Sequence, residues 1–199
     1  MRVSSGTFEG ANLDAALTAA CEGLGARLGE IRYEVVREDE GRVSVDAALD
    51  HVAIVGLFLS ETFRAGTLDM SVRLTSAEDA LEGELEGGDV GLLTAQGGRG
   101  LDALQYLSNR VLNRRLAEHP PVHLDVGGFK SRRAERLQDQ AEAAADEAVR
   151  TGRAVVLGPL TPAARREVHL ALADDPAVET ESDGEGFLKR LVVRPVRRR

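Results

Sequence analysis

Three of the four consecutive positions in Gly97-Gly98-Arg99-Gly100 carry no side chain, and a strongly helical pattern follows directly. Such a density of glycine indicates a backbone conformation that other residues avoid, or an approach to the main chain too close for a side chain. A glycine loop that opens a helix also presents unpaired N–H groups at the positive end of the helix dipole. The segment therefore predicts a loop-helix junction suited to phosphate, although an ordinary helix-start turn would leave the same pattern.

Composition narrows the class of protein. A chain of 199 residues allows one large domain or two to three small ones. Cys21 is the only cysteine, so no intramolecular disulfide can form, which suits a reducing cytoplasm. The opening MRVSSGTFEG lacks the apolar segment of a secretory signal, and the longest apolar run, residues 52–59, is far below the ~20 residues needed to span a bilayer. We expect a cytoplasmic protein without membrane insertion.

The net charge of −8 argues at first against a nucleic-acid partner, but the charges are unevenly distributed. Residues 1–91 carry seven basic and eighteen acidic side chains, whereas residues 92–199 carry eighteen basic and fifteen acidic ones. The basic side chains also lie in clusters along the second half of the chain. A polyanion could therefore bind the second half while the first half repels it.

Hydrophobic periodicity predicts an α+β fold of three small modules, at residues 1–46, 50–150 and 151–199. In the first module we expect a helix capped by Asn12 and ended by Gly25, followed by a strand at residues 31–36 and an acidic loop. The central module is predicted to contain a helix at 50–65, strands at 68–74, 79–86 and 122–126, the glycine loop with its helix, and a long helix at 130–149. The inner stripe of that long helix is expected to be Leu137, Ala141, Ala144 and Ala148.

The third module is predicted to begin with a short strand at residues 154–157. Thr161-Pro162 then forms an N-cap with proline at the first helical position, and the helix runs to about residue 173. Two further strands are expected, one between acidic turns and one at residues 189–193. We find no internal repeat.

The glycine loop matches one nucleotide-binding motif better than the others. The P-loop needs Lys-Ser/Thr after its last glycine, where this chain has Leu101-Asp102, and the spacing does not fit the dinucleotide fingerprint GxGxxG. The GxxG loop of KH domains, which clamps about four nucleotides of backbone, fits Gly97–Gly100. On the following helix, Arg110 and Arg114 share a face. They form either part of a phosphate-binding surface or an ordinary solvated face.

On the inner side of the helix that follows the glycine loop, we expect Leu104, Leu107 and Val111.

A further candidate pair lies in the third module, where Arg165 and His169 are four residues apart on one helix. An arginine fork beside a flat ring can bind a phosphate and stack on a base. Spacing alone equally fits one surface arginine and an unrelated histidine.

Enzymatic chemistry has little support in the sequence. The four histidines show neither an HExxH motif nor the spacing of metal ligands, Cys21 falls on the inner face of a helix, and the alternating glutamates at 82–86 fit a solvated strand face. We therefore expect no catalytic residue, no metal and no cofactor.

Several stretches together resemble the bacterial Jag family, also called KhpB or SpoIIIJ-associated proteins. They are Phe8-Glu9-Gly10, Gly91-Leu92-Leu93, Leu101-Asp102-Ala103-Leu104-Gln105-Tyr106-Leu107, Leu157-Gly158-Pro159-Leu160-Thr161-Pro162 and Thr180-Glu181-Ser182-Asp183-Gly184, with Arg165, Arg166 and His169. The resemblance implies a Jag N-terminal domain at 1–46, a KH domain at 50–150, and an R-three-H domain, named for its Arg-x-x-x-His pair, at 151–199. Without gaps, the family's GxxG falls on residues 95–98. The loop therefore lies either there, in altered form, or at Gly97–Gly100.

The resemblance also implies a function. It predicts a single-stranded RNA-binding protein, an RNA chaperone or post-transcriptional regulator tied to cell shape and to biogenesis of the cell wall and envelope. The partners would be RNA and a small separate KH protein. The sequence also allows a homo-oligomer. The alternative is a protein-interaction adaptor that uses the same surfaces as scaffold. The expected RNA-binding residues are Gln96, Gly97, Gly98, Arg99, Gly100, Arg110, Arg114, Arg165, Arg166 and His169.

Overall fold

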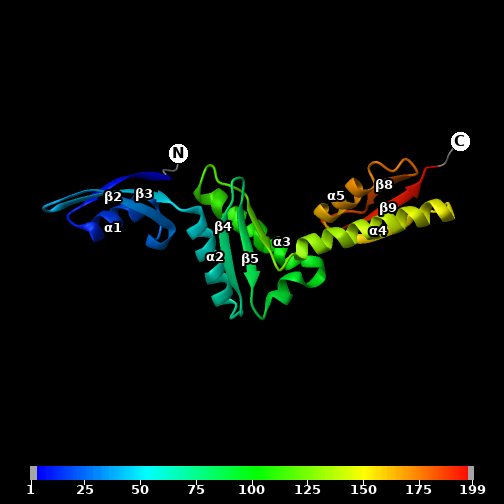
Figure 1. Ribbon diagram of the computed structural model, residues 1–199, viewed down its shortest axis with the longest axis horizontal. Helices are drawn as coiled ribbons and strands as arrows, with labels where there is room; N and C mark the ends of the chain where they lie inside the picture. Colours follow the sequence, from blue (N-terminus) through cyan, green and yellow to red (C-terminus); the bar gives the residue numbers. More distant parts are fainter. Residues whose placement is uncertain (1–3, 197–199) are drawn as a thin grey trace. The chain divides into compact units, whose positions relative to one another are not determined.

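The computed structural model describes residues 4–196, and the chain forms two compact units, Met1–Gly127 and Gly128–Arg199 (Figure 1). The first unit contains β1 (Ser5–Gly10), α1 (Leu13–Leu24), the 3-10 helix η1 (Leu28–Glu30), β2 (Ile31–Asp39), β3 (Arg42–Leu49), α2 (His51–Ala65), β4 (Ser71–Ser76), β5 (Leu81–Glu86), α3 (Val90–Arg115) and β6 (Val122–Asp125). The second contains α4 (Phe129–Thr151), β7 (Val155–Leu160), α5 (Pro162–Ala171), β8 (Val178–Asp183) and β9 (Lys189–Pro195). The described elements confirm the α+β class.

The first sheet has the order β1-β3-β2, with both pairs antiparallel, and α1 packs on β1 and β3 (Figure 1). Both predicted ends of α1 are confirmed. The Asn12 side chain accepts a hydrogen bond from the Ala15 amide at 2.9 Å, and Gly25 ends the helix at a φ of 59°. Alternate residues of β3 face the helix and form the core with it: Ala16, Leu17, Ala20, Leu24, Val43, Val45, Ala47 and Leu49.

The second sheet has the order β4-β5-β6, in which β4 and β5 pair antiparallel and β5 and β6 pair parallel. Parallel neighbours need a long crossover connection, and α3 provides it. Helix α2 contacts β4, α3 contacts β6, and the two helices contact each other. The Asp50 side chain caps α2 by accepting hydrogen bonds from the amides of Val52 and Ala53. Leu81 and Leu85 of β5 face the core.

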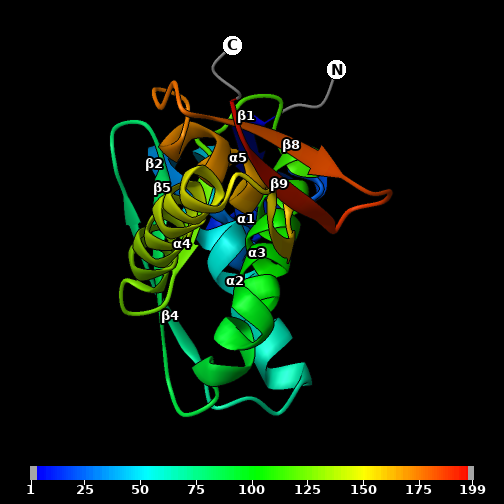
Figure 2. The same ribbon diagram turned by 90° about the vertical axis from the view of Figure 1, so that its right-hand side faces the viewer.

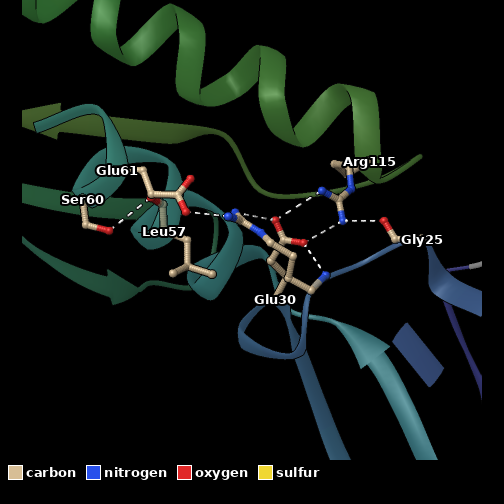
Figure 3. A network of polar contacts seen from close by, with 7 residues as sticks. Gly25, Glu30, Leu57, Ser60, Glu61 and Arg115 are labelled. Atoms are coloured by element: carbon tan, nitrogen blue, oxygen red, sulfur yellow. Dashed lines mark hydrogen bonds and ion pairs between the residues drawn. The ribbon is translucent and has the colours of Figure 1, made fainter. Parts of the chain in front are cut away.

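A buried carboxylate links the first sheet's module to the helices of the second (Figure 3). Glu30 lies in η1 with a side chain only 6% exposed, and it accepts hydrogen bonds from Arg115 at 3.0 Å and from Arg27 at 3.1 Å. Arg115 also donates to the Gly25 carbonyl, and Arg27 reaches Glu61 in α2. Burial by itself raises the pKa of Glu30, but the hydrogen bonds from Arg115 and Arg27 outweigh it and hold this pKa below its ordinary value. The carboxylate is therefore charged and paired near neutral pH.

The second unit packs two helices on an antiparallel sheet of order β7-β9-β8. Helix α4 packs on β9 (Figure 1), and Figure 2 shows both elements from the right-hand side of that view. The predicted inner stripe of α4 is confirmed, because Leu137, Ala141, Ala144 and Ala148 are buried. These small side chains allow close approach to α5, and the stripe shares one core with Val168, Leu191 and Val193.

Three features differ from what periodicity indicated. The first module has three strands rather than one, because β1 precedes and β3 follows the expected strand along the chain. Strand β3 continues past residue 46 to Leu49. The sequence of β1, SGTFEG, does not alternate between apolar and polar residues. The strand is held by its pairing with β3. The long helix α4, placed by sequence in the central module ending at residue 150, buries its apolar face in the second unit, which begins at Gly128.

Candidate nucleic-acid interface

The glycine segment forms a loop that interrupts α3. Ala95 is extended, with a ψ of 156°, and Gln96, Gly97 and Gly98 follow with φ values of 52°, 75° and 86°. Arg99 and Gly100 already belong to the helix. The non-helical loop therefore occupies residues 95–98, where the resemblance places it without gaps, and Gly100 lies in the helix.

Glycine occupies positions 97, 98 and 100 for different physical reasons. Gly97 is exposed, and a Cβ there would touch nothing, so its positive φ alone favours glycine. Gly98 combines a positive φ with burial. Gly100 packs against the helical turn before the loop, where an added Cβ would lie 3.0 Å from the Leu93 Cα. The absence of a side chain at Gly100 thus serves helix packing, whereas Gln96, Gly97 and Arg99 face solvent.

This packing predicts that Gly100→Ala will destabilise the first unit by about 1–2 kcal/mol, because backbone atoms must move to admit the methyl group. Gly91→Ala is the matched control: it lies in the same helix with open space around the added Cβ. There we expect no loss, or a gain of up to about 1 kcal/mol from helix propensity. Urea unfolding of the two variants measures the difference, and equal destabilisation would contradict the packing assignment.

Downstream of the loop, one face of α3 carries a continuous row of exposed side chains, which we call the α3 stripe. Its members, spaced at 3.6-residue periodicity, are Arg99, Ala103, Tyr106, Arg110 and Arg114. The Arg99 guanidinium donates to the Gln96 side chain at 3.3 Å, whereas Arg110 and Arg114 make no ion pair with any residue from 4 to 196. From Arg99 to Arg114 the stripe extends about 22 Å along the helix axis.

Tyr106 was not among the predicted site residues. Its side chain is 63% exposed. The signal that could have found it is its spacing, because Tyr106, Arg110 and Arg114 recur every four residues. The buried face of α3 is Leu101, Leu104, Ser108 and Leu112. The prediction that Leu107 turns inward is wrong: it is 48% exposed, since the core-facing direction passes through Ser108 instead.

In the second unit, Arg165 and His169 both point from α5 toward the hairpin of β8 and β9. The Arg165 Nη1 donates to the carbonyls of Leu160 at 2.9 Å and Phe187 at 3.1 Å. His169 bonds Thr180 through Nδ1 at 2.6 Å and Ser182 through Nε2 at 3.3 Å. Each is half-buried and engaged with the fold, so neither is an unrelated surface residue.

Arg166 differs from its neighbour because it is exposed. For Arg165, one guanidinium nitrogen is committed to main-chain carbonyls. The others, Nε and Nη2, have no partner in the described part of the chain. Nε and Nη2 are the side-on pair of parallel donors of a guanidinium, so the arrangement can still offer two donors to an anion, although Nη1 is already engaged.

Neither a metal site nor a membrane span is found in the described chain. Within residues 4–196, no group of three His, Cys, Asp or Glu side chains is placed to hold a metal ion. None of the described helices combines the length and the apolar character needed to cross a bilayer.

Comparison with known proteins identifies similar sequences. Residues 135–195 match the R-three-H domain family. The chain is 36% identical over 138 residues to "RNA-binding protein KhpB" of Clostridium symbiosum, which covers 68% of this chain and 62% of that protein. The protein of the same name from Lactiplantibacillus plantarum is 38% identical over 103 residues, covering 52% and 32%. That of Bacillus subtilis is 24% identical over 200 residues, covering 94% and 96%.

The C-terminal unit thus contains an R-three-H domain. Over 68% of its length the chain is similar to a protein of the KhpB, or Jag, family. Its alignments span 62% and 32% of the length of the first two of these relatives.

Proposed function

We propose that this protein binds single-stranded RNA without performing chemistry. The observation that carries the proposal is the α3 stripe, which leads from an exposed glycine loop along a row of arginines that make no ion pairs within residues 4–196. Basic side chains along such a row track a phosphate backbone, and an exposed aromatic ring among them offers a stacking surface for a base. The match of residues 135–195 to the R-three-H family, and the names of the relatives, support the same ligand.

In this proposal the two units bind separate stretches of one strand. In a KH-type module, the loop residues Gln96, Gly97 and Gly98 lie against backbone phosphates, and Arg99, Arg110 and Arg114 add charge along α3. Arg165, Arg166 and His169 form the contact of the R-three-H domain. We do not include Gly100 among the proposed contact residues, because its packing on Leu93 explains why this position is a glycine.

The family resemblance extends the proposal to a cellular role. We infer an RNA chaperone or post-transcriptional regulator in the cytoplasm, connected with cell shape and cell-wall biogenesis and acting together with a small separate KH protein. Crosslinking the protein to cellular RNA and mapping the linked residues tests the core of this idea. Crosslinks confined to regions outside α3 and the R-three-H domain would contradict it.

The salt dependence of binding gives a quantitative test. We expect Arg99→Ala to lower the slope of log K against log salt concentration by about one unit, because one phosphate contact and its released counterion are lost. Arg73→Ala is the control: Arg73 is equally a surface arginine of the first unit, but it pairs with Glu86 on the sheet. Its slope should equal that of the parent. A fluorescence anisotropy titration at several salt concentrations measures both.

A protein-interaction adaptor is the second candidate, favoured by the net charge of −8 and by a loop with a single cationic neighbour, Arg99. It predicts purification without bound nucleic acid and association with a protein partner that salt does not weaken. Salt-dependent binding of a short RNA would argue against it.

A further inference from the structure

The turn between β8 and β9 presents an aromatic side chain to solvent. Phe187 is 66% exposed, the largest fraction among the large hydrophobic side chains of the described residues. Single apolar side chains are common on protein surfaces, so exposure alone does not indicate a function. The way in which its main chain is held is more informative.

Arg165 anchors this turn. Its Nη1 bridges the Phe187 carbonyl, at 3.1 Å, and the Leu160 carbonyl, at 2.9 Å, and so ties the turn to the residue just before the cap of α5. Gly184 and Gly186 have φ values of 109° and 83°, which other residues rarely adopt, so the turn also depends on its glycines. The ring of Phe187 is therefore exposed on a fixed backbone rather than on a free loop.

The charges of the hairpin permit an anionic ligand. Asp183 pairs with Arg190 at 3.1 Å and Glu181 pairs with Arg194 at 2.9 Å. Among the acidic side chains of residues 181–185, only Glu185 has no ion pair within the described chain. Arg165 itself keeps Nε and Nη2 without a partner among residues 4–196, so a donor for phosphate lies on the same residue that holds the ring's main chain.

We propose that Phe187 stacks on an unpaired base of single-stranded RNA and that Arg165 is its positioning residue. The inference rests on the proposed function. It adds a base contact by Phe187, a residue that lies outside the Arg-x-x-x-His pair. Stacking on an aromatic ring tolerates any base sequence because every base has a π face. An arginine that holds the ring's backbone and offers donors to the adjoining phosphate would bind one nucleotide unit.

The absence of tryptophan from the sequence permits a direct test in the full-length chain. Phe187→Trp introduces the only tryptophan of the chain, whose emission can be excited apart from that of the two tyrosines. We expect this emission to be quenched when oligouridine is added at low salt. Val149→Trp is the matched control, since Val149 is a 51% exposed apolar side chain of the same unit on α4. Its emission should not change. Equal responses of the two variants would overturn the proposal.

Binding affinities provide a second readout. Phe187→Ala should weaken oligouridine binding roughly 10-fold, while Phe187→Tyr should stay within about twofold, because tyrosine keeps the ring. The salt dependence should not change in either variant, since no charge is removed. An unchanged thermal midpoint shows that the exposed site was altered without unfolding.

A separate experiment tests whether Arg165 positions the ring of Phe187. In the Phe187→Trp background, Arg165→Lys keeps the charge, but the lysine side chain is one atom shorter. Its nitrogen therefore falls short of the position from which Nη1 donates to both carbonyls, and the quenching should fall. Full quenching with weaker affinity would mean that Arg165 only binds phosphate, and the positioning role would be lost. If the parent binds RNA but Phe187→Ala binds equally well, the stacking proposal alone fails. If the parent binds none, the proposed function fails with it.

Discussion

Reversing the charge at the glycine loop, with Gln96→Asp and Arg99→Asp together, should reduce RNA affinity about 100-fold at low salt. A hydrogen bond to a charged group contributes about 1.5–3 kcal/mol, and here its loss is combined with repulsion between carboxylates and phosphates. Gln96 already has a φ of 52°, a conformation that aspartate tolerates better than most residues, so the change is compatible with the fold. Gly98 is left intact because it is buried.

The matched control is Gln96→Asn with Arg99→Lys, which keeps the charge and the loop conformation. We expect its affinity to lie within about threefold of the parent, since lysine replaces one phosphate donor by another. Both proteins should have the parent's thermal midpoint. Parental affinity in the reversed-charge variant would remove the loop and the start of the α3 stripe from the RNA-binding surface.

Arg115→Met should have the largest effect on stability, a loss of about 2–3 kcal/mol in the unfolding of the first unit. The substitution leaves the carboxylate of Glu30 almost fully buried with one of its two arginines, and breaking a buried pair on one side is costly. Because the Arg115 side chain is 24% exposed and Arg27 remains, we place the loss below that of a fully buried pair. The control is Arg114→Met, the adjacent exposed arginine, for which we expect less than about 0.5 kcal/mol.

The pH dependence of this difference follows from the lowered pKa of Glu30. A carboxyl whose folded pKa lies below its ordinary value of 4.5 adds stability above that pH and loses it as the pH falls through the folded pKa. The gap between the parent and Arg115→Met should therefore be full near neutral pH and shrink below about pH 4.5. Urea unfolding across this range measures it, and a gap that grew with acidity would contradict the assignment.

The network around Glu30 also shows which arginines of the basic cluster are available to a ligand. Arg110, Arg114 and Arg115 are equivalent in the sequence as positive charges near a helix end. In the fold, Arg115 turns inward to Glu30 and the Gly25 carbonyl (Figure 3). The other two are exposed on the α3 stripe. Because Glu30 lies 85 residues away along the chain, no local pattern identifies this difference.

Local patterns predicted most helices and their ends. Asn12 and Thr161 each cap a helix as expected, because capping depends on one side chain and amides within three residues. The alternating glutamates at 82–86 indicated the strand β5 for the same reason. The strand β1 was missed because its pairing with β3 is a long-range interaction.

By itself, the sequence determined the α+β class, the caps, the buried stripe of α4 and the position of an unusual glycine segment before a helix, since each depends on neighbours within a few residues. The tertiary structure decided the rest: that the loop occupies residues 95–98, that α4 packs in the second unit, that Arg115 turns inward and that Arg165 holds the Phe187 turn. These features depend on contacts between segments distant in sequence, whose burial and hydrogen bonding local periodicity does not contain.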